Sequence, residues 1–289
     1  MTSEIAIGSR VRKSPFYDAT ISHGVKQFSV YNHMYMPTSY GDPVAEYEAL
    51  TERVSIWDVA VERQVEIVGS EALELVEYLS TRGMRSCKEG RSRYTPICDH
   101  KGILINDPIT LCLGKDRYWM SIADGDLLLW AQAISYERNI ECSVFEPEVS
   151  PLAVQGPKSD ETMADLLGDW VTDIPFFGFV DTELDGIPFL ICRSGWSGQG
   201  GFELFLTDES KGIDLWERVW EAGLKYGIHP GTPNAVERIE SELLSYRADC
   251  AASATPLELG LERFMNLERE DHFIGKEALL SEKSRGPSR

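Results

Sequence analysis

Glycines and one acid are concentrated in residues 190–206, the stretch of this sequence best suited to bind a ligand. Four glycines lie within residues 195–201 between two apolar runs, and the second run carries a single carboxylate, Glu203. Glycine permits tight turns and a close approach of the backbone to a ligand. An acid among apolar neighbours is costly to bury unless a partner compensates it. Two interpretations follow: a hairpin whose Glu203 binds a ligand, and a plain hairpin whose Glu203 faces water.

The hairpin needs a scaffold, and hydrophobic periodicity predicts one. Alternating apolar residues indicate strands, and apolar residues at helical spacing indicate helices. The patterns predict strands over residues 64–68 and 118–124, and helices over residues 69–81, 125–139, 212–227 and 235–246. Because these elements mix without strict βαβ alternation, the sequence predicts an α+β fold with largely antiparallel sheets.

The predicted helix over residues 212–227 is amphipathic. Ile213, Trp216, Trp220 and Leu224 share one face, and Gly227 is placed to end the helix as its C-cap. We therefore expect the two tryptophans to pack in the core rather than to line a ligand cage.

The charge of the chain narrows its partners. Lys+Arg 28 against Asp+Glu 47 gives a net charge of −19. This balance argues against nucleic acid, because phosphate binding needs clustered cations, and against anionic membrane surfaces. It leaves room for a small anionic ligand, since one lysine or arginine in a pocket can bind a carboxylate.

Length, cysteines and apolar runs bound the class of protein. The 289 residues, 43% of them hydrophobic, suffice for one large or two smaller folded units. Neither the six cysteines nor the five histidines show the spacing of a zinc or redox motif, so we predict core cysteines and no metal. No apolar run approaches ~18 residues and no signal-peptide pattern opens the chain, which predicts a soluble cytoplasmic protein without a membrane span.

Residues 190–206 resemble the folate-binding hairpin of the aminomethyltransferase family, the T-protein of the glycine cleavage system, which reads roughly R-T-G-Y-T-G-E-x-G-x-E. Further stretches that resemble motifs of this family, in the right order, are residues 91–94, 101–107, 152–158 and 238–246. The resemblance implies tetrahydrofolate as the cofactor. It also implies the family's folate-binding fold over residues 1–280, with two mixed α/antiparallel-β subdomains around a central channel.

Within that superfamily the sequence is most similar to the dimethylsulfoniopropionate demethylases, which move a methyl group from a sulfonium to tetrahydrofolate. The stretches that carry this narrower resemblance are residues 31–37, 57–65, 106–108, 121–124 and 193–197. It implies a folate-dependent methyltransferase whose partner is a small-molecule methyl donor.

The end of the chain resembles the point where the family enters a third, C-terminal β-barrel domain. The residues concerned are 273–279 and 286–289. We therefore expect residues 281–289 to be the start of a truncated barrel domain, which in the family closes one side of the folate channel.

Five residues match cofactor-binding positions of the family: Tyr94, Gln155, Trp196, Glu203 and Arg238. The two oxygens of a glutamate suit adjacent N–H donors on a pterin edge, which is the role implied for Glu203. For Arg238 an alternative remains open, namely an ordinary ion pair with Glu242 one turn further along a helix.

Asn106 and Asp107 match a pair of adjacent acids in the aminomethyltransferases, of which the first is catalytic. Here Asn106 takes the place of that first acid. A sulfonium releases a neutral thioether that needs no proton, so the loss of an acid favours direct methyl transfer over methylene transfer. The alternative is that Asn106 is a turn residue before Asp107.

A sulfonium donor with a carboxylate calls for an aromatic face and a cation. Three residues near the matching motifs meet this need: Lys26 for the carboxylate, and Tyr31 and Phe202, besides Trp196, for the sulfonium.

Two other functions remain open. The first is an aminomethyltransferase of glycine cleavage, which dependence on a lipoylated carrier protein would support; Asn106 and Gln199, where that family usually has acids, speak against it. The second is a non-catalytic folate-binding protein, although the K-G-C-Y motif of such relatives does not occur here. The sequence leaves the oligomeric state open, a homodimer included.

Overall fold

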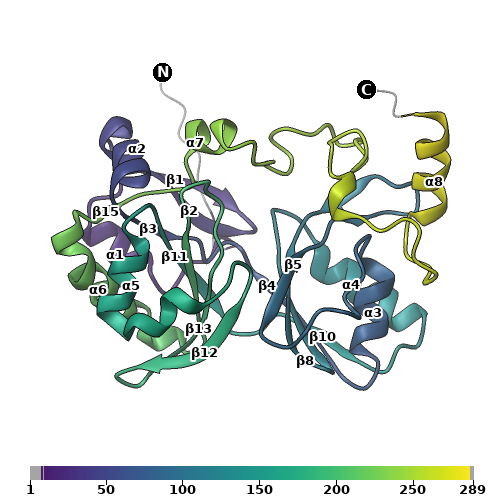
Figure 1. The fold of residues 1–289 in the computed structure, drawn as a ribbon, viewed down its shortest axis with the longest axis horizontal. Helices are drawn as coiled ribbons and strands as arrows, with labels where there is room; N and C mark the ends of the chain where they lie inside the picture. Colours follow the sequence, from purple (N-terminus) through teal and green to yellow (C-terminus); the bar gives the residue numbers. More distant parts are fainter. Residues whose placement is uncertain (1–7, 9, 287–289) are drawn as a thin grey trace. The chain divides into compact units, whose positions relative to one another are not determined.

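The computed structural model describes residue 8 and residues 10–286 and divides the chain into two units (Figure 1). The first unit combines the residues up to Val61 with Glu148–Leu243. The second combines Glu62–Pro147 with the residues from Leu244 onward. Each unit has its own sheet and its own hydrophobic core. The chain therefore passes from the first unit into the second after Val61, returns to the first at Glu148, and enters the second again at Leu244.

The first unit is built on a six-stranded sheet in the order β12-β13-β14-β11-β3-β15. Its pairs are antiparallel except β15 with β3. The strands are β3 (Ser55–Asp58), β11 (Ser150–Gln155), β12 (Phe179–Leu184), β13 (Ile187–Cys192), β14 (Gly201–Leu206) and β15 (His229–Pro230), and a separate hairpin joins β1 (Gln27–Tyr31) to β2 (Met34–Ser39). The helices are α1 (Tyr17–Ser22), α2 (Pro43–Glu52), α5 (Ser159–Leu167), α6 (Gly212–Gly223) and α7 (Ala235–Glu240), with 3₁₀ turns at Asp169–Asp173, Glu209–Lys211 and Leu224–Tyr226.

The two faces of this sheet differ because side chains alternate along a strand. Leu152 and Val154 of β11 and Phe202 and Leu204 of β14 enter the core of the first unit. Helices α1, α5 and α6 lie together on this face (Figure 1) and contribute buried side chains to the same core. The residues in between, Glu203 among them, point to the opposite face.

The second unit is built on an antiparallel five-stranded sheet in the order β10-β4-β9-β8-β5. Its strands are β4 (Gln64–Val68), β5 (Arg91–Tyr94), β8 (Ile109–Gly114), β9 (Arg117–Ser121) and β10 (Ser143–Phe145), and β6 (Ile97–Cys98) pairs with β7 (Leu104–Asn106). Its helices are α3 (Ala72–Leu79), α4 (Leu127–Glu137) and α8 (Lys276–Arg285), with a 3₁₀ turn at Glu262–Phe264. Apolar residues of α3, β4 and β9 form the core.

The predicted α+β architecture with largely antiparallel sheets is confirmed, and the predicted strands and helices exist with small shifts of their ends, except the helix over residues 235–246. Gly227 has the left-handed conformation of a cap, at φ 71°, and ends the 3₁₀ turn that extends α6. Trp216 is a core residue, as expected. The predicted face of α6 was partly wrong, because Ile213 and Leu224 are exposed, whereas Leu215 and Val219 are buried with Trp216.

In the C-terminal third of the chain, helix α7 is shorter than predicted. The helix predicted over residues 235–246 ends at Glu240, because Glu242 has φ 55° and cannot continue a right-handed helix. The expected start of a barrel domain at residues 281–289 stays a prediction, and residues 287–289 lie outside the described residues. None of the described helices combines the length and the apolar character that crossing a bilayer requires.

Candidate cofactor and substrate site

The glycine-rich stretch forms the connection between β13 and β14. We call residues 193–200 the glycine loop. The strands before and after it pair in register, with Cys192 opposite Glu203. Gly195 has φ 148° and lies so close to Gln155 that a Cβ there would come within 2.1 Å of its side chain. Glycine is therefore required at this position both for its conformation and for its lack of a side chain.

Glu203 lies on the face of the sheet opposite the first unit's core. Its neighbours across the strands are Cys192 and Ala153, and Trp57 lies beyond Ala153 in the same row. The residue is 7% exposed, and the hydroxyl of Ser194 donates a hydrogen bond to Oε2. Burial raises the pKa of this carboxyl, and the Ser194 hydrogen bond only partly offsets the effect. Among the described lysines and arginines none forms an ion pair with Glu203, which leaves the carboxylate able to accept N–H donors from a ligand.

Gln155 holds the glycine loop by hydrogen bonds. Its Nε2 donates to the carbonyl oxygens of Ser194 at 3.0 Å and Phe202 at 3.3 Å, and its Oε1 accepts from Ser197 Oγ at 2.7 Å. The side chain is fully buried. These hydrogen bonds hold the glycine loop, and the expected contact of Gln155 with the cofactor stays a prediction.

Trp196 and Arg238 meet at the glycine loop. Trp196 is half-buried, and the guanidinium carbon of Arg238 lies 5.9 Å from the centre of its ring, at the outer limit of a cation–π contact. Arg238 also donates to the carbonyl oxygen of Leu243 at 3.3 Å. Helix α7 ends at Glu240, before Glu242, and the alternative of an ion pair between Arg238 and Glu242 stays open.

The three residues expected to bind the methyl donor lie in different surroundings. Phe202 is fully buried in the core of the first unit, and its side chain points away from the face that carries Glu203; its expected contact with the substrate stays a prediction. Tyr31 packs against the same core at the end of β1. Lys26 is exposed, with its aliphatic chain against Gly41.

Asn106 is held by the backbone of the second unit. Its Nδ2 donates to the carbonyl oxygen of Ala123 at 3.0 Å, and its Oδ1 accepts from the backbone N–H groups of Asp107 and Ala123, both at 3.1 Å. The side chain has no exposed surface. Asn106 therefore joins the end of β7 to the segment that follows β9, and both its catalytic role and the turn-residue alternative stay open.

Asp107 and Tyr94 are the titratable residues among the second unit's candidates. The phenol of Tyr94 donates to its Oδ2 at 2.9 Å. Burial raises the pKa of Asp107 to about 7, against a smaller lowering effect of the Tyr94 hydrogen bond. Burial and the carboxylate of Asp107 both raise the pKa of Tyr94, whose ring lies edge-on to Phe264 at 4.8 Å. Near neutral pH, therefore, Tyr94 keeps its proton and Asp107 is partly protonated.

The candidate residues are thus divided between the units. The first unit groups Gln155, Trp196, Glu203 and Arg238 around the glycine loop, and the second groups Tyr94, Asn106 and Asp107. The sequence interpretation missed one buried acid, Glu237 of α7, which accepts from the backbone N–H of Gly198 at 2.8 Å. No sequence motif marks Glu237. Its apolar neighbours Val236 and Ile239 would be expected to face the core, which would leave Glu237 exposed.

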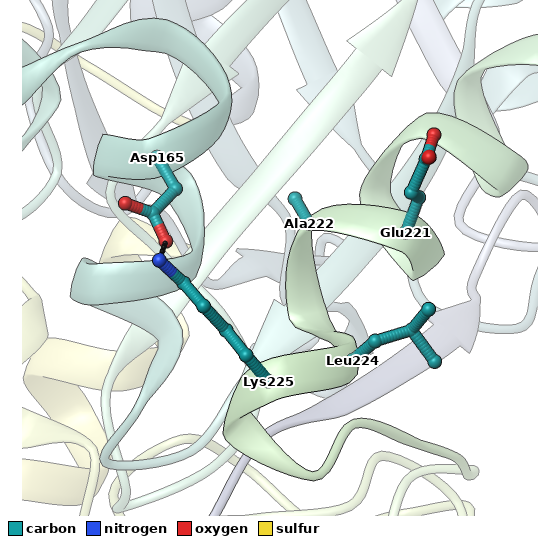
Figure 2. A pocket seen from close by; sticks show the side chains of 5 residues that line it. All are labelled: Asp165, Glu221, Ala222, Leu224 and Lys225. Atoms are coloured by element: carbon teal, nitrogen blue, oxygen red, sulfur yellow. Dashed lines mark ion pairs between the residues drawn. The ribbon is translucent and has the colours of Figure 1, made fainter.

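A surface hollow elsewhere on the first unit is not a candidate site (Figure 2). It is lined by Asp165, Glu221, Ala222, Leu224 and Lys225. Its cation and one of its acids already neutralise each other, because Lys225 Nζ lies 2.5 Å from Asp165 Oδ2. Within residues 10–286, moreover, no group of three or more histidine, cysteine or acidic side chains is arranged to hold a metal ion.

Comparison with known proteins places this geometry in context. The family model described as the GCVT N-terminal domain matches residues 16–269. The dimethylsulfoniopropionate demethylase DmdA of Ruegeria pomeroyi is 42% identical over 280 residues, which cover 97% of this chain and 76% of that protein. An aminomethyltransferase of Desulfitobacterium hafniense is 29% identical over 287 residues, covering 97% of this chain and 78% of the relative.

Solved structures agree at the level of the fold. The glycine cleavage system aminomethyltransferase T of Bartonella henselae superposes with a TM-score of 0.86 at 23% identity, over 96% of this chain and 76% of that one. The heterotetrameric sarcosine oxidase of Corynebacterium sp. U-96 gives a TM-score of 0.51 at 18% identity, over 74% of this chain and 96% of the matched chain.

Proposed function

Because the chain belongs to the GCVT N-terminal domain family, we propose that it transfers a methyl group from dimethylsulfoniopropionate, or a close sulfonium analogue, to tetrahydrofolate. The chain is an enzyme of folate-dependent one-carbon transfer, with tetrahydrofolate as its cofactor and a small molecule as its substrate.

The polar groups around the glycine loop fit tetrahydrofolate. A pterin edge presents adjacent N–H groups, and Glu203 is a buried carboxylate held by a serine rather than by a cation. Charge-assisted hydrogen bonds to such a carboxylate are strong because little water competes for it. We assign Glu203 to the pterin, with Trp196 and Arg238 as its neighbours and Gln155 as the support of the loop.

Asn106 is the observation that favours a sulfonium over an aminomethyl donor. The buried amide is bonded to backbone groups at both of its polar atoms and cannot exchange a proton. Bound tetrahydrofolate supplies N5 as the methyl acceptor. Since a sulfonium leaves as a neutral thioether, the protein needs no general acid for the leaving group. What remains for the chain is to orient two molecules, to exclude water, and to let the proton that N5 loses on methylation pass to solvent.

Asp107 and Tyr94 are the groups of the second unit that we assign to the reaction. With its pKa raised to about 7, Asp107 carries a proton for part of the time at neutral pH and holds the Tyr94 phenol in one orientation. Lys26 and Tyr31 remain proposals for the donor's carboxylate and sulfonium.

A donor panel tests the proposal. The purified chain is incubated with tetrahydrofolate and one donor at a time: dimethylsulfoniopropionate, a quaternary ammonium, an aryl methyl ether, or an aminomethylated lipoyl carrier protein. Chromatography separates 5-methyl- from 5,10-methylenetetrahydrofolate. We expect the 5-methyl product with the sulfonium alone. The methylene product with the lipoyl carrier would instead establish the aminomethyltransferase alternative.

A cytoplasmic location and a homodimer are further predictions for this enzyme. Sedimentation equilibrium of the purified chain measures the oligomeric state, and fractionation of the source cells measures the location.

A further inference from the structure

Helix α7 turns its acid inward and its apolar residues outward. Glu237 is 1% exposed, whereas Val236 and Ile239 are 59% and 63% exposed. A surface helix of a globular protein normally shows the reverse pattern, with its apolar residues against the core. Local departures from this rule are concentrated at functional or strained sites. The buried carboxylate of Glu237 therefore needs an explanation beyond packing.

One oxygen of Glu237 explains how the glycine loop is held. Oε1 accepts hydrogen bonds from the backbone N–H of Gly198 at 2.8 Å, from Ser241 Oγ at 2.7 Å and from Gln199 Nε2 at 3.2 Å. The approach is close enough that a Cβ on Gly198 would meet Ser241 Oγ at 2.1 Å. Because glycine is the residue that allows this contact, loop and helix are matched to each other.

The other oxygen is not used in this way. Oε2 is buried, and no donor within the described residues lies at hydrogen-bond distance from it. A buried acceptor without a partner is unfavourable, and native structures usually retain one for a functional reason. Oε1 accepts three hydrogen bonds from the protein, whereas Oε2 accepts none from the described residues. This difference indicates that a ligand group is the partner of Oε2.

We propose that Glu237 is a second carboxylate of the cofactor site, whose Oε1 fixes the glycine loop and whose Oε2 accepts a hydrogen bond from an N–H group of tetrahydrofolate. The proposal rests on the proposed function. Of the two ligands in that function, the cofactor carries N–H groups, whereas dimethylsulfoniopropionate has neither N–H nor, as a carboxylate, O–H. Glu237 therefore contributes to cofactor affinity and not to donor affinity.

The test compares Glu237→Gln with wild type by calorimetric titration of tetrahydrofolate and, separately, by the KM for dimethylsulfoniopropionate. The amide keeps an acceptor for Gly198 and places an N–H₂ donor where the free acceptor was. We expect the cofactor Kd to rise about tenfold or more, with the donor KM and the melting temperature nearly unchanged. The matched control is Glu240→Gln, an exposed glutamate of the same helix, which leaves the Kd unchanged.

A lower melting temperature with an unchanged Kd would show that Glu237 is only structural and would overturn the inference. Should Glu237→Gln not fold, Glu237→Asp keeps the charge on a shorter side chain, and a Kd equal to that of wild type in this variant also contradicts the proposal. If the wild-type chain itself binds no tetrahydrofolate, the proposed function fails and the inference falls with it. A failure confined to the variant comparison leaves the proposed function intact.

Discussion

Three carboxyl groups, those of Glu203, Glu237 and Asp107, carry the proposed function. Glu203 and Glu237 lie on the two sides of the glycine loop, and Asp107 lies beside a tyrosine in the second unit. Burial raises the pKa of Glu203 and of Asp107, because an ionised group is less stable away from water. Acids kept in such surroundings are typical of sites that bind N–H groups or control protons.

Replacing Glu203 by glutamine separates binding from folding. The amide loses the charge-assisted acceptor for the pterin, so we expect tetrahydrofolate affinity to fall by about 1.5–3 kcal/mol, roughly ten- to a hundredfold. The free energy of unfolding at neutral pH should stay equal or rise, since the variant no longer buries a carboxylate. Calorimetric titration and denaturant unfolding measure the two quantities. Unchanged affinity in a folded variant would remove Glu203 from the site.

Asp107 makes a pH-dependent contribution to stability. Its pKa is about 7 in the folded chain and lower in the unfolded chain, so the folded state binds the proton more tightly. The stability from this group is complete below the unfolded pKa of about 4 and is lost as the pH rises through about 7. We expect the melting temperature of wild type to fall relative to that of Asp107→Asn as the pH rises from 4 to 8, because only the wild type has the ionisable group. Parallel curves for the two proteins would contradict this.

The glycine loop is the element that positions the candidate cofactor residues. It is supported from below by Gln155 and tied to α7 by Glu237, and it carries Trp196 between these contacts. Strand β14, which follows the loop, presents Glu203 on the face opposite the core. The precision of the site is therefore a property of one hairpin and the side chains that hold it.

Gly195→Ala is expected to disturb this element more than Gly200→Ala. Both positions have positive φ, which costs alanine about 1–2 kcal/mol, but only at Gly195 would the new methyl group overlap a buried neighbour, at 2.1 Å from Gln155. At Gly200 the added Cβ meets nothing within 4 Å. Denaturant unfolding and cofactor titration of the two variants test the difference, and equal losses in both would show that the close contact with Gln155 is unimportant.

Much of this element could be predicted from the sequence, and the failures have physical reasons. The alternation of apolar residues and the cluster of glycines predicted the hairpin. The same alternation places Phe202 and Glu203 on opposite faces of the sheet, with Phe202 in the core of the first unit. Glu237 could not be predicted, because its burial depends on Gly198, 39 residues earlier in the chain. Likewise, the bonds of Asn106 to Ala123 arise only from the fold.

At the scale of the whole molecule, each unit depends on chain segments that are far apart in sequence. In the second unit, Arg269 returns to α3 and pairs with Glu77, and both side chains are buried. Glu77 also accepts from the backbone N–H groups of Met84 and Arg85. This cluster ties the segment after Leu244 to the body of the unit, and neither residue suggested such a role in the sequence.

Removing one partner of this buried pair should be strongly destabilising. For Glu77→Gln we expect a loss of about 3–5 kcal/mol in the free energy of unfolding, because the arginine is left buried without its counter-charge. The exposed pair of Lys158 and Glu161 provides the control, and Lys158→Ala should cost less than about 1 kcal/mol. Urea unfolding measures both, and a small loss for Glu77→Gln would show that the cluster contributes little.

The most direct measurement follows the methyl group itself. The chain is incubated with tetrahydrofolate and with dimethylsulfoniopropionate that carries fully deuterated methyl groups, and the folate product is analysed by mass spectrometry. Direct transfer predicts 5-methyltetrahydrofolate with all of the methyl deuterium retained, together with the thioether acid. Binding of both ligands without a labelled folate, or a labelled methylene product, would contradict the account.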